Sequence, residues 1–494
     1  MRWNASRAAP DTLPGRKMIS RTIRLLAYGL MTISLSAAVF LRGGVYPQQW
    51  EWSALGISLA AALAVLCVPK PERAPGDAWG FTLMALLLAW MLFQLLPLPP
   101  ALVQRLSPAR WSAVAAARAA TGYDMRDWAA LSVAPSATFG RLLDVVPAMA
   151  AFVAAREMAW WWRRRMWVVV APVIGVACFE SILGLIQFYF NRIANGQGGL
   201  VSGTYVSHNH FAGLVEMGFP VALMWAIATW RKGESDRNRS VPSALWTATL
   251  LAIAACLLMG VIVSLSRMSF ISTLIAAALV MLTVLGSWAA RNPESNPESN
   301  PGSNPGSNPA SNPASRGLFH WGRWIIPAAV PLCVLVVLPP HELIQRFADM
   351  AGNEDVTTRG RMEIWRETIQ LASAYKWTGC GLGAYERGLY RYKNLAPVNT
   401  IDFAHNDYLQ ILAELGIAGA LLVGALGVWV LSRLLSVVIW RKRARSWELA
   451  VGVLGAVLAL GVHSLADFNL YIPANALVFA WLCGVGASTG LASG

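Results

Sequence analysis

The chain has 494 residues, of which 56% are hydrophobic and 13% charged. A soluble globular protein carries about 25% charged residues, so this composition excludes that class. The formal net charge of +14 would suit a nucleic-acid binder, but the basic residues stand in short clusters between apolar runs. Five of the six cysteines lie in apolar segments, and Cys380 has no cysteine partner in its own loop. We therefore expect no disulfide framework and no cysteine metal site.

Apolar runs of about 20 residues, bounded by Arg, Lys, Trp and Pro, are typical of helices that cross a membrane. Residues 1–24 are polar and basic, and we expect them to form a cytoplasmic tail before a retained first helix. The sequence predicts 12 spans, nine within 25–339 and three within 407–494. The runs are 25–41, 51–68, 79–97, 140–156, 166–190, 210–230, 244–265, 268–290, 324–339, 407–432, 447–465 and 473–491.

Short basic clusters indicate on which side of the membrane each loop lies. Arg163–Arg165 and Arg441–Arg443 fall on the same side as the N-terminus when the spans alternate. Short loops rich in Lys and Arg usually stay in the cytoplasm. Both termini are therefore expected in the cytoplasm, and the long loops 98–139 and 340–406 on the outer side.

Residues 292–315 repeat the pattern Asn-Pro-x-Ser six times. A proline in every repeat and no apolar residue larger than Ala exclude a packed core. The topology places this repeat in the cytoplasm, and we interpret it as a flexible linker.

The loop 340–406 begins a predicted helix at Thr357 or Thr358, which either threonine can cap. Arg359 and Arg361 then fall in the first helical turn, where the helix dipole disfavours cations. Two arginines in this unfavourable position indicate an anionic partner. The alternative is a solvated charged end, because residues 340–405 hold eight acidic and eight basic residues.

Gly379, Gly381 and Gly383 form a GxGxG turn after that helix. Glycine-rich turns can bring backbone N–H groups to a phosphate. A strand before and a helix after the turn are not evident, so a plain turn is the favoured interpretation.

His405 stands just before the tenth predicted span, followed by Asn406 and Asp407. The positive end of a helix dipole opposes protonation, and a neutral imidazole near the water interface is a usable general base. The alternative is that Asn406 or Asp407 only caps the helix and that His405 hydrogen-bonds nearby.

Arg267 lies in a turn of a few residues between two spans on the outer side. Its guanidinium must snorkel, pair or bind something anionic, and we favour binding. His208 and His210 resemble a metal pair, but the sequence fixes no third ligand, so we expect no metal. Acids are costly inside spans, and we expect arginines such as Arg267 to pair with four of them: Glu180, Glu216, Glu414 and Asp467.

Together these residues resemble the O-antigen ligase and polymerase superfamily, bacterial inner-membrane glycosyltransferases that take glycans from a polyprenyl pyrophosphate carrier. The resemblance covers roughly 200–420. The matching pieces are Gly203-Thr204, Asn209-His210-Phe211-Ala212, Ser266-Arg267, Gly360-Arg361 with Trp365, the GxGxG turn, His405-Asn406-Asp407-Tyr408-Leu409, and Glu414-x-Gly416. Two departures stand out: His208 occupies a position where relatives often carry Arg, and Trp377-Thr378 replaces a usual Pro-Leu pair.

The resemblance implies an all-α, GT-C-like polytopic fold with about 12 transmembrane helices and a large helical periplasmic loop, 340–406. It implies an enzyme that moves a glycan from undecaprenyl pyrophosphate to a hydroxyl, without cofactor or metal. His405 would be the catalytic base, and Arg267 and Arg361 would hold the pyrophosphate. The other expected substrate-binding residues are Arg359, His208, Asn209, Asn406, Asp407 and Tyr408.

The acceptor is not readable from these motifs. Lipid A core in a ligase, another glycan in a polymerase and a protein hydroxyl in a protein O-oligosaccharyltransferase all remain open. A secondary transporter is the alternative from another class, because acids within spans can couple transport to ion flow. The apolar spans show no convincing repeat of the kind common in transporters, and the polar clusters lie at one face, which favours the enzyme.

Overall fold

The computed structural model describes residues 14–69, 73–75, 77–196, 199–235, 241–289, 344, 356–393 and 400–491. The linker 292–315 and the predicted span 324–339 lie outside these residues. Helices dominate the fold: α1 (Pro14–Phe40), α2 (Pro47–Ala62), α3 (Ala78–Phe93), α4 (Pro100–Leu106), α5 (Pro108–Thr121), α6 (Pro135–Trp161), α7 (Trp167–Asn195), α8 (His208–Ser235), α9 (Val241–Val263), α10 (Arg267–Ala289), α13 (Val356–Ala374), α14 (Tyr385–Leu389), α15 (Asp407–Trp440), α16 (Trp447–His463) and α17 (Pro473–Thr489).

Local chemistry explains where several helices begin and end. Proline lies in the first turn of α2, α4, α5, α6 and α17, where its missing N–H removes no helical hydrogen bond. The side chain of Asp77 caps α3 by accepting a 3.3 Å hydrogen bond from the Gly80 amide. Gly122 and Gly196 take positive φ angles and end α5 and α7.

Within the described residues, eight helices are long and apolar enough to cross a membrane. They are α1, α2 with the π-helical turn Leu63–Cys67 that continues it, α6, α7, α8, α9, α10 and α15. The chain is thus a polytopic all-α membrane protein.

The predicted spans 79–97, 447–465 and 473–491 form the shorter helices α3, α16 and α17, of 16, 17 and 17 residues. At 1.5 Å per residue such helices reach about 24–26 Å, less than the roughly 30 Å of a bilayer core. Eight of the 12 predicted runs therefore reach full spanning length in the part of the chain that the structure describes.

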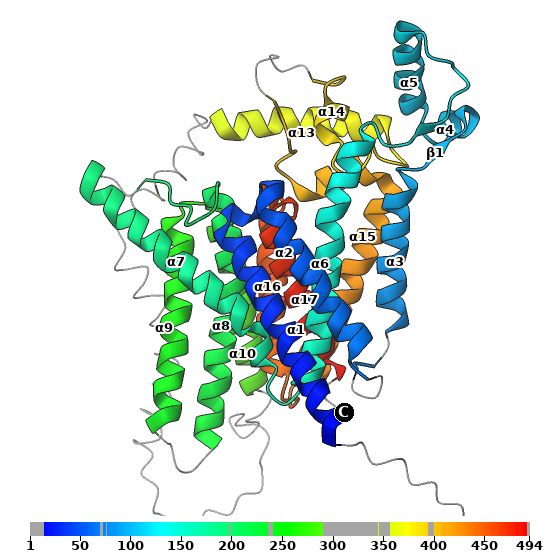
Figure 1. Cartoon of the computed structure of the whole chain (residues 1–494). Coiled ribbons are helices and arrows are strands. Elements are labelled where there is room, and N and C mark those ends of the chain that lie inside the picture. The colour runs from blue at the N-terminus through cyan, green and yellow to red at the C-terminus, as the bar shows by residue number, and fades with distance from the viewer. Residues whose placement is uncertain are drawn as a thin grey trace, which may run out of the picture.

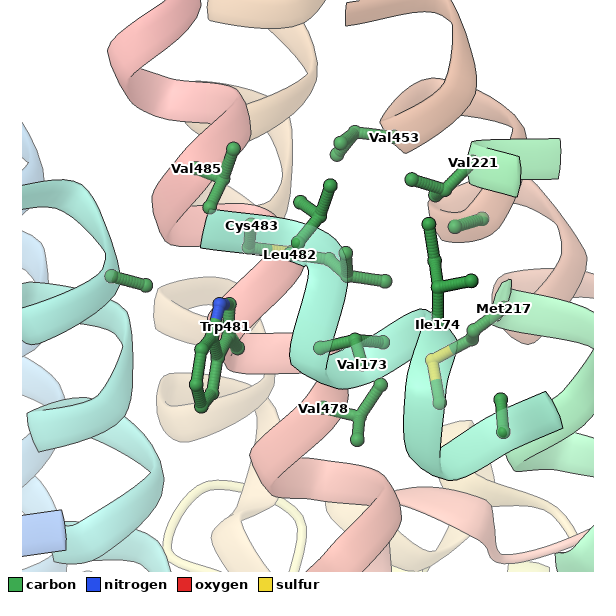
Figure 2. Packing of buried hydrophobic residues seen from close by; sticks show 14 of the residues in the cluster. Val173, Ile174, Met217, Val221, Val453, Val478, Trp481, Leu482, Cys483 and Val485 are labelled. Carbon is green, nitrogen blue, oxygen red and sulfur yellow. The ribbon is translucent and has the colours of Figure 1, made fainter. Parts of the chain in front are cut away.

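The largest hydrophobic core runs through the helix bundle from α1 to α17, and Figure 2 shows its part where α7, α8, α16 and α17 meet. Trp481 is fully buried there, and its indole N–H donates a 2.9 Å hydrogen bond to the Val169 carbonyl. Glycine lets α16 come close to α8, because a Cβ on Gly455 would lie 2.8 Å from Cβ of Pro220. This close contact fixes the position of α16 along α8. Figure 2 labels Val173, Ile174, Met217, Val221, Val453, Val478, Leu482, Cys483 and Val485 around Trp481.

The connections between helices gather at two ends of the bundle (Figure 1). At one end, the Tyr28 hydroxyl of α1 donates to the Val168 carbonyl, and Ser446 Oγ donates to the Thr489 carbonyl at the end of α17. At the other end, α13 lies across the bundle, above the start of α15 (Figure 1). We call this second end the α13 end.

The segment between α3 and α6 covers part of the α13 end. It holds α4, α5 and a two-stranded antiparallel ladder of β1 (Pro97–Leu98) and β2 (Ala129–Ala130). The Val133 amide donates a 2.7 Å hydrogen bond to the Cys380 carbonyl. This bond ties the segment to the turn that follows α13.

Candidate functional site

The start of α15 fixes the backbone around His405. Asn406 is the N-cap: its side-chain oxygen accepts a 3.0 Å hydrogen bond from the Leu409 amide, and its Nδ2 donates to the Leu465 carbonyl. His405 precedes the cap with φ of 51°, in the left-handed region that a non-glycine residue seldom adopts. The predicted helix entrance is therefore present, with the imidazole displayed on a strained residue just outside it.

Asp407 and Tyr408 attach this helix start to the segment before α17. Asp407 Oδ2 accepts hydrogen bonds of 2.7 Å from Ser464 Oγ and 3.1 Å from the Leu470 amide. The Tyr408 hydroxyl donates to the Gly461 carbonyl at 2.7 Å. These contacts are internal and fix the start of α15 next to His405, and the contact of both residues with substrate stays a prediction.

A cavity of about 880 Å³ opens at the α13 end, and His405 and Asn209 both line it. Its wall comes from the starts of α2, α6 and α8, from α13, from residues 400–405 and from residues 467–473. This volume lies in the upper part of the range for small-molecule sites. Segments far apart in the sequence thus enclose one space next to the predicted base.

Asp467 lies among three imidazoles at the edge of this cavity. Its Oδ1 is 3.6 Å from Nε2 of His210 and 3.9 Å from Nδ1 of His405, and its Oδ2 is 4.0 Å from Nε2 of His463. Burial alone would raise the pKa of this carboxyl, but the interactions with His210, His405 and His463 hold the pKa well below its usual range. An ionised carboxylate therefore faces His405. We had not expected this pairing.

Arg141 supplies a cation inside the cavity. Its Nη1 lies 3.0 Å from Asp144 Oδ2 and donates a 3.1 Å hydrogen bond to the Tyr471 carbonyl. Its guanidinium also lies over the rings of Tyr471 and Phe403, at 5.0 and 5.9 Å from their centroids. Lys393 is a second cation in the lining. The sequence signal for Arg141 was a basic residue near the start of an apolar run.

Arg361 lies on the first turns of α13, between the cavity-lining residues Gly360 and Ile364. Its Nε is buried and has no hydrogen-bond partner among the described residues. The indole N–H of Trp365 donates a 2.9 Å hydrogen bond to the Ala404 carbonyl, which holds this part of α13 against the residue before His405. Arg359 lies in the same helix, and its side chain is outside the described part.

Arg267 is the first residue of α10, at the same end of the bundle. The turn before it is fixed by Leu265, with φ of 56°, and by a 3.0 Å contact between His208 Nδ1 and the Ser264 carbonyl. His208 therefore contacts the Arg267 turn, whereas His210, two residues later, lies beside Asp467. The two imidazoles face different groups. Arg267 and His208 stand next to the cavity wall and are not part of its lining.

The glycine turn after α13 packs against Glu414 of α15. The Gly383 amide donates a 2.8 Å hydrogen bond to Glu414 Oε2, and the Gly381 amide donates to the Glu414 carbonyl at 3.0 Å. All three glycines have positive φ angles, and a Cβ on Gly379 would lie 2.1 Å from the Glu414 carbonyl oxygen. The turn therefore packs against α15, which agrees with the favoured interpretation of a plain turn.

The pairing of membrane acids with arginines stays a prediction, and the hydrogen bonds of three of these acids go to other groups. These three acids contact hydroxyl, amide and imidazole groups. Glu180 accepts from Thr204, Glu216 contacts Ser272 and His463, and Glu414 contacts Gln410, Tyr471 and Gly383. These bonds hold α7, α8 and α15 to neighbouring segments at the α13 end.

The fold and this cavity define the class of protein. It is a polytopic membrane protein in which a histidine, a carboxylate and cations line one cavity at one end of the helix bundle. A family model described as O-antigen ligase matches residues 251–424, which include Arg267, Arg361 and His405. This match confirms the resemblance seen in the sequence and, together with the apolar helices, supports a membrane ligase or glycosyltransferase of the bacterial inner membrane. A search of the curated proteins found no match.

Proposed function

We propose that this protein transfers a glycan from undecaprenyl pyrophosphate to an acceptor hydroxyl, with the α13 end on the periplasmic side of the inner membrane. The observation that carries the proposal is the cavity at that end, where His405 and Asp467 meet beside Arg141 and Lys393. The family match supports transfer chemistry in general. The donor, the acceptor and the residue roles are part of the proposal.

His405 acts as the general base. It accepts the proton of the acceptor hydroxyl while that oxygen forms a bond to the anomeric carbon of the glycan. Asp467, 3.9 Å from Nδ1, orients the imidazole and stabilises the positive charge that the ring gains. A side chain 36% exposed at the cavity edge can reach substrate and release its proton to water afterwards.

Arginines stabilise the leaving group. The bond between the anomeric carbon and the pyrophosphate oxygen breaks as the new bond forms, so negative charge develops on the pyrophosphate. Arg361 supports this role because its buried Nε has no partner among the described residues. Arg267 and Arg359 act with it as charge-assisted donors to phosphate oxygens. Attack from the face opposite the leaving group inverts the anomeric centre.

The test is a transfer assay with purified protein in detergent, an undecaprenyl-pyrophosphate glycan and three acceptors: lipid A core, a free glycan and a protein. We expect wild type to modify one acceptor, and His405→Ala and Arg361→Ala to lose most of the rate. Arg366→Ala is the matched control, because Arg366 is an exposed arginine on the same helix. If wild type moves no glycan while protein-loaded vesicles show solute flux, the enzyme proposal fails and transport takes its place.

Orientation needs its own measurement. Ala119 is exposed on α5 at the α13 end. An Ala119→Cys variant should react with a membrane-impermeant thiol reagent added to intact spheroplasts. Reaction only after the membrane is opened would place the α13 end in the cytoplasm and contradict the proposed topology.

A further inference from the structure

The cavity contains a cluster of stacked aromatic rings. The rings of Phe403 and Phe468 stack with centroids 4.2 Å apart and an interplanar angle of 9°. Tyr471 meets Phe403 edge-on at 5.8 Å, and His405 meets Phe468 edge-on at 4.9 Å. Phe403 and Phe468 are half-buried and line the cavity, so part of each ring faces its interior. We call these two rings the aromatic platform.

The charges around the platform do not favour a wholly anionic ligand. The cavity lining holds three carboxylates, Asp144, Asp402 and Asp467, against two cations, Arg141 and Lys393. A ligand that filled this space with phosphate would face repulsion from the carboxylates. Carboxylates and histidines beside open aromatic rings suit a neutral ligand with many hydroxyl groups, which donates hydrogen bonds to the acids.

We propose that the aromatic platform binds a sugar ring of one of the two substrates, with the pyrophosphate held outside it, toward Arg361 and Arg267. The proposal rests on the proposed glycan transfer and assigns the subsite where the reacting sugar lies. The C–H groups on one face of a pyranose carry slight positive charge and pack against the negative face of an aromatic ring. The contact between Phe468 and His405 puts such a sugar next to the base.

The cavity volume agrees with a sugar site on the aromatic platform and a pyrophosphate site outside it. A space of about 880 Å³ is larger than a single sugar ring requires, because drug-sized ligands bind in pockets of roughly 300–1,000 Å³. Sugar rings from donor and acceptor therefore fit at the same time. The kinetic constants tell which of the two lies on the platform.

The first test is Phe403→Leu, because Phe403 makes no described contact with His405 and the base stays in place. We expect the KM of either donor or acceptor to rise about tenfold, which corresponds to about 1.4 kcal/mol, with kcat little changed. Phe403→Tyr keeps the ring and should restore the wild-type KM. Phe190→Leu is the matched control, because Phe190 is 67% exposed on the surface of α7.

A rise in the donor KM assigns the platform to the donor sugar, and a rise in the acceptor KM assigns it to the acceptor. Unchanged KM values for both, in a variant that still transfers glycan, overturn the proposal and leave the transferase function standing. A wild type without any transfer is the separate failure of the proposed function.

A second measurement does not depend on kinetic constants. Aromatic protons of the wild-type protein are saturated selectively by NMR, with lipid-free core oligosaccharide and then lipid-free O-antigen fragment as probes. Saturation should pass to sugar C–H protons of one probe, and Phe403→Leu should weaken it. No transfer to either probe, with enzyme that is active, contradicts the platform.

Discussion

Replacing Asp467 by Asn removes the carboxylate charge next to His405 and keeps the shape of the side chain. The Asn carbonyl oxygen still accepts the hydrogen bond that the Phe468 amide gives to Asp467 Oδ1 at 2.8 Å, so the local fold should persist. Two unit charges about 4 Å apart attract by about 1 kcal/mol in water and about 4 kcal/mol at an effective dielectric of 20. His405 is 36% exposed and Asp467 2%, at 3.9 Å, so we take an intermediate value of about 2 kcal/mol.

If Asp467→Asn removes about 2 kcal/mol of stabilisation from the protonated imidazole, kcat should fall about 30-fold. The assay is glycan transfer with saturating donor and acceptor, measured across pH for wild type and Asp467→Asn. Asp127→Asn is the control, because Asp127 is an exposed acid far from the cavity lining. A kcat within threefold of wild type at every pH, in folded Asp467→Asn protein, would refute the role of Asp467 in positioning and stabilising His405.

Three further predictions follow from the same structure. Arg361→Ala should lower kcat/KM for the donor about 10- to 150-fold, because a hydrogen bond to a charged group contributes about 1.5–3 kcal/mol. Arg361→Lys keeps the charge but loses the planar guanidinium, so it should recover only part of that loss. Full recovery in Arg361→Lys would mean that only the charge matters. Gly416→Ala should lower the free energy of unfolding by about 2 kcal/mol or more, because Gly416 has φ of 65° and its Cβ would lie 2.5 Å from the Trp377 carbonyl oxygen. Thermal unfolding measures this change, and Gly424→Ala on the same helix, with nothing within 4 Å of its Cβ, should be neutral or slightly stabilising. Because the folded-state pKa of Asp467 is depressed, its charge stabilises the fold fully above pH 3.8 and the benefit disappears only as the pH falls through the lower folded value. The Tm difference between wild type and Asp467→Asn should therefore not shrink as the pH falls from 7 to about 5, and a steady decline over that range would contradict the depressed pKa.

Much of the helical frame was readable from the sequence, because hydropathy and capping are local properties. The helix predicted from Thr357 or Thr358 to about residue 375 is α13, but it begins at Val356, so both threonines lie inside the helix and neither caps it. The predicted helix entrance at His405 is the capped start of α15. Full spanning length was harder to predict, because hydropathy does not mark where a helix stops. Gln94 shows this: the run 79–97 continues past it, but α3 ends at Phe93, where Gln94 turns to bond the Thr378 and Glu414 carbonyls.

The partners inside the site were not readable, because they come from distant segments. Asp467 was singled out as an acid at a span edge, but nothing local shows that it lies among three histidines from α8, α16 and the residue before the cap of α15. Glu414 contacts an amide 31 residues away, in the glycine turn, and no spacing rule links the two. Arg141 has no local feature beyond its place at the start of the apolar run 140–156. Pairings of this kind depend on how the helices pack.

Glu414 joins three parts of the α13 end through one buried side chain. Its Oε2 accepts hydrogen bonds from the Gly383 amide in the glycine turn and from the Tyr471 hydroxyl before α17, and its Oε1 accepts one from Gln410 Nε2. The turn is therefore attached to α15 by an acid buried away from solvent, and added salt should have little effect on that attachment. Glu414→Gln would replace one acceptor oxygen by a donor and should weaken the bonds to Gly383 and Tyr471.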